Sequence, residues 1–382
     1  MAGSSSFEAG KVKEGAGPFG LLTVAHPLLA TAKDTLLSAV NNAPPGSIVM
    51  VFGPTGVGKT TLRLKIQHLL SEQTREAMET DWERMPFASI EAAAPDNGAF
   101  SWRDYYRRLL MAMAEPMLDH KVKPDPRCRP LVPPLTSNRG TATELRHAVE
   151  SAILHRRPSV VMIDEAQHLT RMVSGRKLMD QLDVIKSLAN CTGTTHVLLG
   201  TYELLVLRHL SGQLGRRTVD VHFRRYRGND PADMHIFKNV VATFQNHLPL
   251  PEESDLVSLW EFLYERSVGC IGILKEWLQR ALILALDEKC SSLTEHHVES
   301  TALSAAQCEK IAIEAHEGEA QIECSNEPRS RLRALLGLSA VGKISTPVTH
   351  PGHRRPLMVG KRRPLRDPVG KGLDSTAVCC DV

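Results

Sequence analysis

The sequence predicts an α/β fold built on a parallel sheet covered by helices, followed by a small all-helical domain and a disordered basic tail. Short apolar runs alternate with segments of helical periodicity as far as residue 230, which is the pattern of a parallel sheet. From Pro231 onward only helical periodicity remains, and beyond about residue 320 Pro, Gly and Arg dominate. We therefore expect a flexible leader at 1–18, an α/β domain at 19–230, a helical domain at 231–320 and a tail at 321–382.

The individual elements follow from apolar runs, periodicity and breakers. Five short runs that contain β-branched or aromatic residues are expected to be strands, at 47–52, 87–91, 159–163, 195–199 and 219–223. The helices expected between and before them lie at 21–40, with an interruption at Pro27, and at 62–73, 101–110, 143–155, 178–189 and 202–210. The helical domain is expected to contain helices at 234–247, 255–266, 273–286 and 294–314.

A glycine-rich loop joins the first strand to the helix that follows it. Its G-x-x-x-x-G-K-T spacing between a strand and a helix is that of a phosphate-binding P-loop, or Walker A motif. Glycines let the backbone wrap a phosphate, the amides at the helix start favour an anion, and lysine adds a positive charge. The expected ATP-binding residues are Gly53, Pro54, Thr55, Gly56, Val57, Gly58, Lys59, Thr60 and Thr61.

Acidic and hydroxyl side chains follow two later strands. Asp164 and Glu165 end the run at 159–163, which is the Walker B arrangement. We expect Thr60 and Asp164 to hold Mg²⁺ and Glu165 to polarise the attacking water. Thr201 follows the run at 195–199, where it would either contact the γ-phosphate and the water or cap the next helix.

Three basic residues are candidates for completing an ATPase site. Arg216 and Arg217 precede the last strand, and an arginine there would reach a neighbouring subunit's nucleotide or would be a solvated surface charge. Lys275 begins a helix of the helical domain and would be either a second nucleotide sensor or a surface lysine.

Charge and composition restrict the setting. The formal net charge is +3, but residues 326–382 hold 11 Lys and Arg against 4 Asp and Glu, so the tail is strongly basic and suits a polyanion or an acidic partner. No apolar run is long enough to span a membrane, and the cysteines show no zinc spacing. A cytoplasmic protein is the expectation.

Taken together, these motifs resemble those of AAA+ ATPases, and more narrowly those of the TnsC/TniB transposition regulators, including those of CRISPR-associated transposons. The narrower likeness lies in the sequences at 164–169, 199–201, 214–217 and 221–226. It implies an ATPase that forms a ring or helical filament on double-stranded DNA and links a target selector or TniQ-type adaptor to transposase subunits. ATP hydrolysis would disassemble that oligomer. Thr201 would be the first sensor. The expected helical domain departs from the family pattern, because it shows no clear G-x-x-R sequence of the usual second sensor.

Contact with DNA is also expected from the distribution of basic residues, because binding to the phosphate backbone needs only Lys and Arg spaced along a surface. The candidates are Arg103, Arg107, Arg108, Arg139, Arg176 and Lys177. Two alternatives to transposition stay open. One is another AAA+ class, such as a replication-initiator-like protein or an ExeA-like secretion ATPase, which shares the D-E-A-Q-H-L sequence. The other is a scaffold that binds ATP without hydrolysing it, against which Glu165 argues.

Overall fold

The computed structural model describes residues 17–95, 100–115, 141–170, 175–210, 218–322 and 332–338. The chain divides into two units, residues 1–323 and 324–382, and everything described below belongs to the first. Within the described ranges, none of the helices combines the length and the apolar character that crossing a bilayer requires.

A single five-stranded sheet forms the centre of this unit. The strands are β1 (Ile48–Phe52), β2 (Ala88–Glu91), β3 (Val160–Asp164), β4 (Thr195–Gly200) and β5 (Thr218–His222). All adjacent strands are parallel, and the order across the sheet is β2-β3-β4-β1-β5. The five predicted strands are therefore confirmed. Because β4 lies between β1 and β3, the segments that follow these three strands meet at one edge of the sheet.

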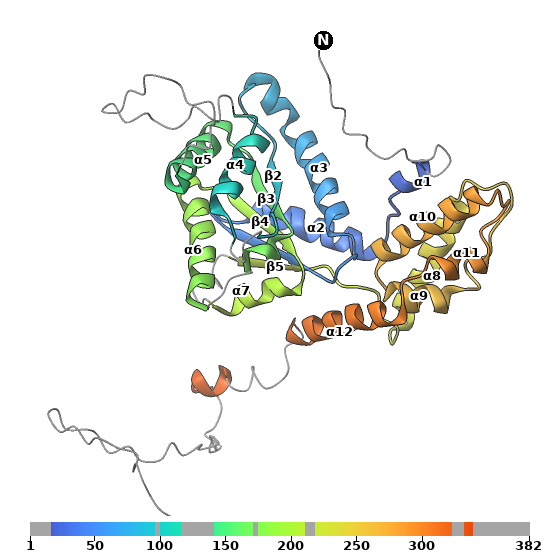
Figure 1. Cartoon of the computed structure of the whole chain (residues 1–382). Coiled ribbons are helices and arrows are strands. Elements are labelled where there is room, and N and C mark those ends of the chain that lie inside the picture. The colour runs from blue at the N-terminus through green and yellow to red at the C-terminus, as the bar shows by residue number, and fades with distance from the viewer. Residues whose placement is uncertain are drawn as a thin grey trace, which may run out of the picture. The chain divides into compact units, whose positions relative to one another are not determined.

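Helices cover both faces of the sheet, as the continuous apolar runs of its central strands require. Val49 and Val51 point into a core with helices α2 (Pro27–Asn42) and α3 (Lys59–Thr80). Ile48, Met50 and Phe52 point into the opposite core, which holds α4 (Trp102–Ala112), α5 (Ala142–Arg156) and α6 (Gly175–Thr192) (Figure 1). Three short segments complete this domain: η2 (Ala166–Thr170), η3 (Tyr202–Leu204) and α7 (Leu205–Leu210).

A helical domain follows β5, as predicted. It comprises α8 (Pro231–Asn246), α9 (Trp260–Ser267), α10 (Ile271–Asp287) and α11 (Glu295–Ser300). Its core surrounds the fully buried Trp277, whose indole N–H donates to the carbonyl of Val298 at 2.9 Å. Phe19, on the short helix α1 (Gly17–Leu21), also packs in this core. The helical domain therefore takes part of its core from the start of the chain.

The single helix expected at 294–314 is wrong, because the chain breaks between α11 and α12 (Ala305–Ile322). The Thr301 hydroxyl donates to the carbonyl of His297 at 2.7 Å, which satisfies a carbonyl at the end of α11. The Ser304 hydroxyl then accepts from the amide of Gln307 at 3.3 Å, and the Gln307 side chain accepts from the Ser304 amide at 3.1 Å. This reciprocal cap starts a new helix in a new direction.

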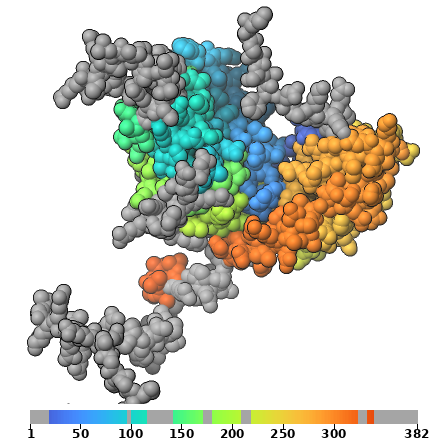
Figure 2. All heavy atoms as spheres, in the orientation of Figure 1, coloured from blue at the N-terminus to red at the C-terminus, as the bar shows by residue number. Residues whose placement is uncertain are grey.

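Helix α12 returns from the helical domain to the α/β domain. Gly318 lies against the ring of Tyr202, so closely that a Cβ atom there would lie 2.1 Å from Tyr202 Cγ. Ala315 is buried in the core that contains Ile48, Met50 and Phe52, and Ile322 packs against the same core. In Figure 2 the orange atoms of the C-terminal helices lie against the green atoms of the α/β domain. Helix α12 thus connects the two domains.

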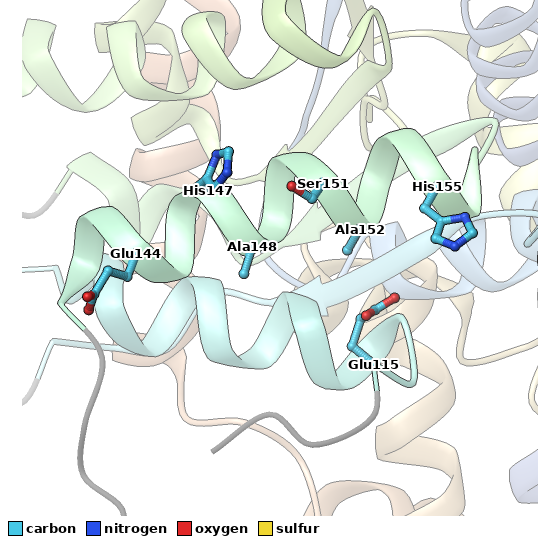
Figure 3. Close-up of a pocket in the computed structure, with 7 residues that line it drawn as sticks. All are labelled: Glu115, Glu144, His147, Ala148, Ser151, Ala152 and His155. Carbon is cyan, nitrogen blue, oxygen red and sulfur yellow. The ribbon is translucent and has the colours of Figure 1, made fainter. Parts of the chain in front are cut away.

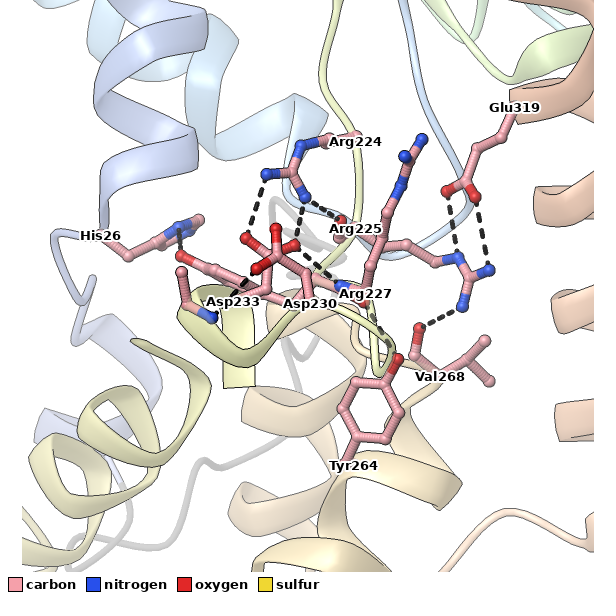
Figure 4. A network of polar contacts seen from close by, with 11 residues as sticks. His26, Arg224, Arg225, Arg227, Asp230, Asp233, Tyr264, Val268 and Glu319 are labelled. Atoms are coloured by element: carbon pink, nitrogen blue, oxygen red, sulfur yellow. Dashed lines mark hydrogen bonds and ion pairs between the residues drawn. The ribbon is translucent and has the colours of Figure 1, made fainter. Parts of the chain in front are cut away.

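The segment between β5 and α8 is held by ion pairs and by one histidine (Figure 4). The Arg224 guanidinium pairs with both oxygens of Asp233, and Arg225 pairs with Glu319 of α12 at 3.0 Å. His26 Nδ1 lies 2.9 Å from the Tyr226 hydroxyl. His26 precedes α2 and Tyr226 follows β5, so this contact joins two chain segments that run between the domains.

Candidate functional site

The P-loop lies at the edge of the sheet where β1 ends, and its glycines are required by close contacts. A Cβ atom on Gly53 would lie 2.1 Å from the carbonyl oxygen of Phe223. Gly58 has φ of 111° and stands at the N-cap of α3, a conformation that favours glycine. The first helical bond runs from the Leu62 amide to the Gly58 carbonyl at 2.9 Å. The three preceding amides therefore remain available to an anion.

Lys59 is buried beside this loop. Its ammonium donates to the carbonyls of Gly53 at 3.1 Å and Pro54 at 2.8 Å. Burial lowers the pKa of Lys59, and the negative charges of Glu165 and Asp164 oppose that change. The cation is thus placed between the loop and the two carboxylates, where it would meet an incoming phosphate.

Asp164 is the central carboxylate of the site. Its Oδ2 atom lies 3.3 Å from the Thr60 hydroxyl and accepts from Arg63 Nε at 2.9 Å, and Oδ1 accepts from the Glu165 amide at 3.0 Å. Arg63 also donates to the Ser89 hydroxyl on β2 at 3.1 Å. The structure therefore brings together Thr60 and Asp164, the two predicted ligands of the metal.

Glu165 stands one residue beyond the end of β3 in a left-handed backbone conformation, with φ of 51°. Its carboxylate accepts a hydrogen bond from the side-chain amide of Gln167. The other end of that amide, Oε1, accepts from the backbone N–H of Thr201 at 3.3 Å. The residue expected to activate water is thus joined to the residue expected to sense the γ-phosphate.

Thr201 follows β4 and opens η3, but its hydroxyl makes no capping bond. The Thr201 Oγ1 atom is buried and has no hydrogen-bond partner among the described residues. An unpaired buried hydroxyl costs free energy, about 1–3 kcal/mol. A ligand that supplied a partner would remove that cost. Of the two roles considered for Thr201, this geometry agrees with the sensor better than with the cap.

These residues fit a nucleoside triphosphate with Mg²⁺. The free amides at the start of α3 and the buried Lys59 suit the phosphates. The Thr60 hydroxyl and the Asp164 carboxylate lie together, where they could hold a hydrated metal ion. The Thr201 hydroxyl, which has no partner among the described residues, lies at the same edge of the sheet. Two contributors were not predicted, Arg63 and Gln167. Arg63 is four residues after Lys59 in α3, so helical spacing alone places it on the same face.

Lys275, the candidate for a second nucleotide sensor, contacts α1 in this structure. Its ammonium donates to the carbonyl of Gly20 at 2.7 Å, beside α1, and partial burial lowers the pKa of Lys275. The start of α10 does touch the P-loop, but through its backbone. The Ile273 amide donates to the carbonyl of Gly56 at 3.2 Å, and a Cβ atom on Gly272 would lie 2.4 Å from that carbonyl oxygen. In this structure, Lys275 holds α1 rather than facing the P-loop.

The other predicted basic residues are only partly placed. Arg216, Arg217 and Arg139 lie outside the described residues, and Arg176 and Lys177 lie in the first turn of α6. Arg103, Arg107 and Arg108 lie on α4, where Arg108 pairs with Asp104 at 2.6 Å. Two further arginines follow β5: Arg224 forms an ion pair with Asp233, and Arg225 forms one with Glu319. The DNA-contacting face and the arginine finger stay predictions.

A separate cavity of about 530 Å³ lies between α5 and the end of α4. Figure 3 shows Glu144, His147 and His155 of α5 on its wall, with Glu115 opposite. Glu115 is itself paired with Arg156 at 3.3 Å. None of the predicted ATP-site residues lines this cavity, which is therefore distinct from the P-loop.

Comparison with known proteins supports the fold and the domain type. Residues 45–207 match the family described as AAA domain, a description that names no narrower group. The fold is accordingly the predicted AAA+ P-loop fold, with its parallel sheet and a following helical part. No curated protein matches the sequence significantly.

Several solved structures are similar to this chain at low sequence identity and with TM-scores below 0.5. The ORC2 protein of Aeropyrum pernix is 14% identical, with a TM-score of 0.48, over 75% of this chain and 72% of that one. The ORC1 protein of the same organism, in complex with DNA, is 17% identical, with a TM-score of 0.47, over 74% of this chain and 67% of that one. Drosophila ORC bound to DNA is 15% identical, with a TM-score of 0.42, over 88% of this chain and 76% of that one.

Proposed function

We propose that this chain is a Mg²⁺-dependent ATPase that converts ATP and water to ADP and phosphate and works on double-stranded DNA. The AAA domain supports nucleotide hydrolysis in general. The observation that carries the proposal for this chain is the set of side chains at the ends of β1, β3 and β4. Lys59, Asp164, Glu165 and Thr201 meet at one edge of the sheet, and the Gln167 amide joins the last two.

Each side chain has a definite task in that reaction. The amides at the start of α3 and the Lys59 ammonium bind phosphate oxygens and balance their charge. Thr60 and Asp164 would hold Mg²⁺, which stabilises charge on the β- and γ-phosphates. Glu165 accepts a proton from the attacking water, and the Thr201 hydroxyl donates to the γ-phosphate or to that water. Arg63 orients Asp164 through its 2.9 Å contact.

Replacing Glu165 by Gln tests the assignment of the base. Loss of a general base lowers kcat by about 10²- to 10⁴-fold, whereas ATP binding should persist because the amide keeps the shape of the carboxylate. Phosphate release and binding of a fluorescent ATP analogue measure the two quantities. Glu203→Gln is the matched control, since Glu203 is an exposed glutamate beside the site. A Glu165→Gln protein that hydrolyses ATP at the wild-type rate would refute the assignment of Glu165 as the base, and a wild-type protein without ATPase activity would refute the proposed function.

Two roles on DNA remain candidates. The D-E-A-Q-H-L sequence at 164–169 favours a transposition regulator that links a target selector or TniQ-type adaptor to transposase subunits. The similar solved structures include origin-recognition proteins, two of them described with DNA, and they accord better with the replication-initiator-like alternative. At these identities the likeness establishes the shared fold alone.

The two roles differ in how DNA is recognised. A protein that coats DNA contacts the phosphate backbone and binds unrelated duplexes of equal length equally, while an initiator prefers certain sequences. Competition binding with several duplexes in the presence of ATP separates these cases. Electron microscopy of the same samples shows whether rings or filaments form. Monomers only, together with an ATPase rate that DNA leaves unchanged, would exclude both roles.

A further inference from the structure

Gln167 is a buried polar side chain that contacts both halves of the hydrolytic site. Only 5% of its surface is exposed, and it belongs to η2, directly after the carboxylates that follow β3. Its Nε2 atom donates to Glu165 Oε2, and its Oε1 atom accepts from the Thr201 amide at 3.3 Å. The single amide group therefore spans the gap between the end of β3 and the end of β4.

The chemistry of the two partners fixes which way the Gln167 amide points. An ionised carboxylate can only accept a hydrogen bond, and a backbone N–H can only donate one. The amide must consequently turn its NH₂ group to Glu165 and its oxygen to Thr201. A rotated amide would lose both bonds and would leave the Thr201 N–H without its acceptor. Both ends of Gln167 are thus specified by the neighbours that they bind.

Space for this arrangement is provided by Gly200, the last residue of β4. A Cβ atom on Gly200 would lie 2.5 Å from Gln167 Oε1 and 2.9 Å from Leu204 Cδ1. Gly200 is not among the glycines with positive φ, so its backbone conformation is open to other residues. Glycine is needed here for the approach of the Gln167 side chain and not for the shape of the backbone.

We infer that Gln167 is a positioning residue for hydrolysis, an inference that rests on the proposed ATPase function. It holds one oxygen of Glu165, so that the other is directed at water, and it ties that carboxylate to the backbone of the sensor residue Thr201. A general base works only within hydrogen-bond reach of its proton, so a carboxylate free to rotate loses rate.

Gln167→Met tests this role, because methionine fills similar volume and forms neither hydrogen bond. We expect kcat for ATP to fall about 10- to 100-fold, since a displaced catalytic group costs about that much. KM and the affinity for a fluorescent ATP analogue should stay within twofold of wild type, because Gln167 is assigned no contact with the nucleotide. Gln67→Met on α3 is the matched control, as Gln67 is also buried and makes no contact with Glu165. Its kcat should remain unchanged.

A second pair of variants separates positioning from a merely structural role. Adding Gln167→Met to Glu165→Gln should lower the residual rate no further, because the amide acts through Glu165. Gly200→Ala should reproduce the loss in kcat, because its methyl group displaces the Gln167 oxygen while the amide itself remains. Should Gln167→Met fail to fold by thermal melting, Gln167→Asn replaces it, keeping the amide but falling one methylene short of both partners.

The outcomes distinguish this inference from the proposed function. Wild-type kcat in both Gln167→Met and Gly200→Ala overturns the positioning role while leaving the ATPase assignment intact, provided that Glu165→Gln is inactive. The positioning role is also overturned if Gln167→Met lowers kcat by the same factor in the Glu165→Gln protein as in the wild-type protein. Hydrolysis by Glu165→Gln at the wild-type rate, in contrast, refutes the assignment of Glu165 as the base. A wild-type protein that releases no phosphate from ATP refutes the proposed function itself.

Discussion

Breaking the contact between Arg225 and Glu319 from one side should strongly destabilise this protein. The two residues are 94 positions apart, and only 16% of the Arg225 side chain and 8% of the Glu319 side chain are exposed. Two nitrogen–oxygen contacts, of 3.0 Å and 3.4 Å, join them. Arg225 otherwise donates to the Val268 carbonyl at 3.5 Å. Removing the negative charge would leave a largely buried guanidinium with weak compensation.

Glu319→Gln makes that change without altering the shape of the side chain. Breaking a fully buried pair from one side costs about 3–5 kcal/mol of unfolding free energy. Because both partners here keep some contact with solvent, we expect a loss of about 2–4 kcal/mol. For a domain of this size the loss corresponds to a fall in Tm of roughly 5–10 °C. Differential scanning calorimetry measures Tm, and hydrogen exchange shows whether the amides of α12 lose protection first.

The matched control is Glu265→Gln. Glu265 pairs with Arg266 at 3.3 Å, but 65% of its side chain is exposed, so its loss should cost about 1 kcal/mol or less. Replacing both partners, as in Arg225→Met with Glu319→Leu, should recover much of the stability, because no buried charge is then left alone. Equal losses of Tm for Glu319→Gln and Glu265→Gln would refute the reasoning.

Three further changes have defined outcomes. Gly53→Ala places a methyl group against the Phe223 carbonyl, so binding of a fluorescent ATP analogue should weaken more than tenfold. Gly193→Ala strains a backbone with φ of 67° before β4 but meets nothing closer than 4.0 Å, so it controls for general strain and should bind the analogue normally. Burial lowers the pKa of His26 to about 4 from 6.5, so the unfolded chain binds a proton between these values that the folded chain does not. The free energy of unfolding therefore falls as pH drops from 6.5 to about 4, and His26→Asn, which keeps a capping oxygen, should reduce that fall by up to about 3 kcal/mol in urea titrations. Deleting the residues after 325, which form the basic tail, removes none of the contacts described for α12. ATPase activity should therefore persist, while the interaction with a partner of the tail weakens. Loss of ATPase activity would show that the tail is part of the folded enzyme.

Local patterns predicted most of the fold. Apolar runs such as Val49–Met50–Val51 belong to strands buried on both faces, so their composition identifies them. The helix expected at 294–314 failed because apolar periodicity continues across Thr301 and Ser304, where side-chain hydrogen bonds end one helix and begin the next. Such caps compete with periodicity and are hard to weigh from sequence.

The site was predictable where its chemistry is local. The P-loop and the carboxylates that follow β3 are short motifs, and the structure brings them together. The contacts of Lys275 with Gly20 and of Arg225 with Glu319 join residues far apart in the chain, so no local pattern reveals them. Gln167 was visible within D-E-A-Q-H-L, but its role depends on β4 lying beside β3, which only the strand order shows.

Where Gly56 meets Gly272 and Ile273, the backbone of the P-loop lies directly against the backbone at the start of α10, with the Ile273 side chain beside Gly56. A shift of a few tenths of an ångström in the loop is therefore passed directly to the first turn of α10. Because residues of α10 supply much of the helical domain's core, we expect that core to respond to such a shift. Nucleotide binding at the P-loop would then affect the helical domain through this backbone contact.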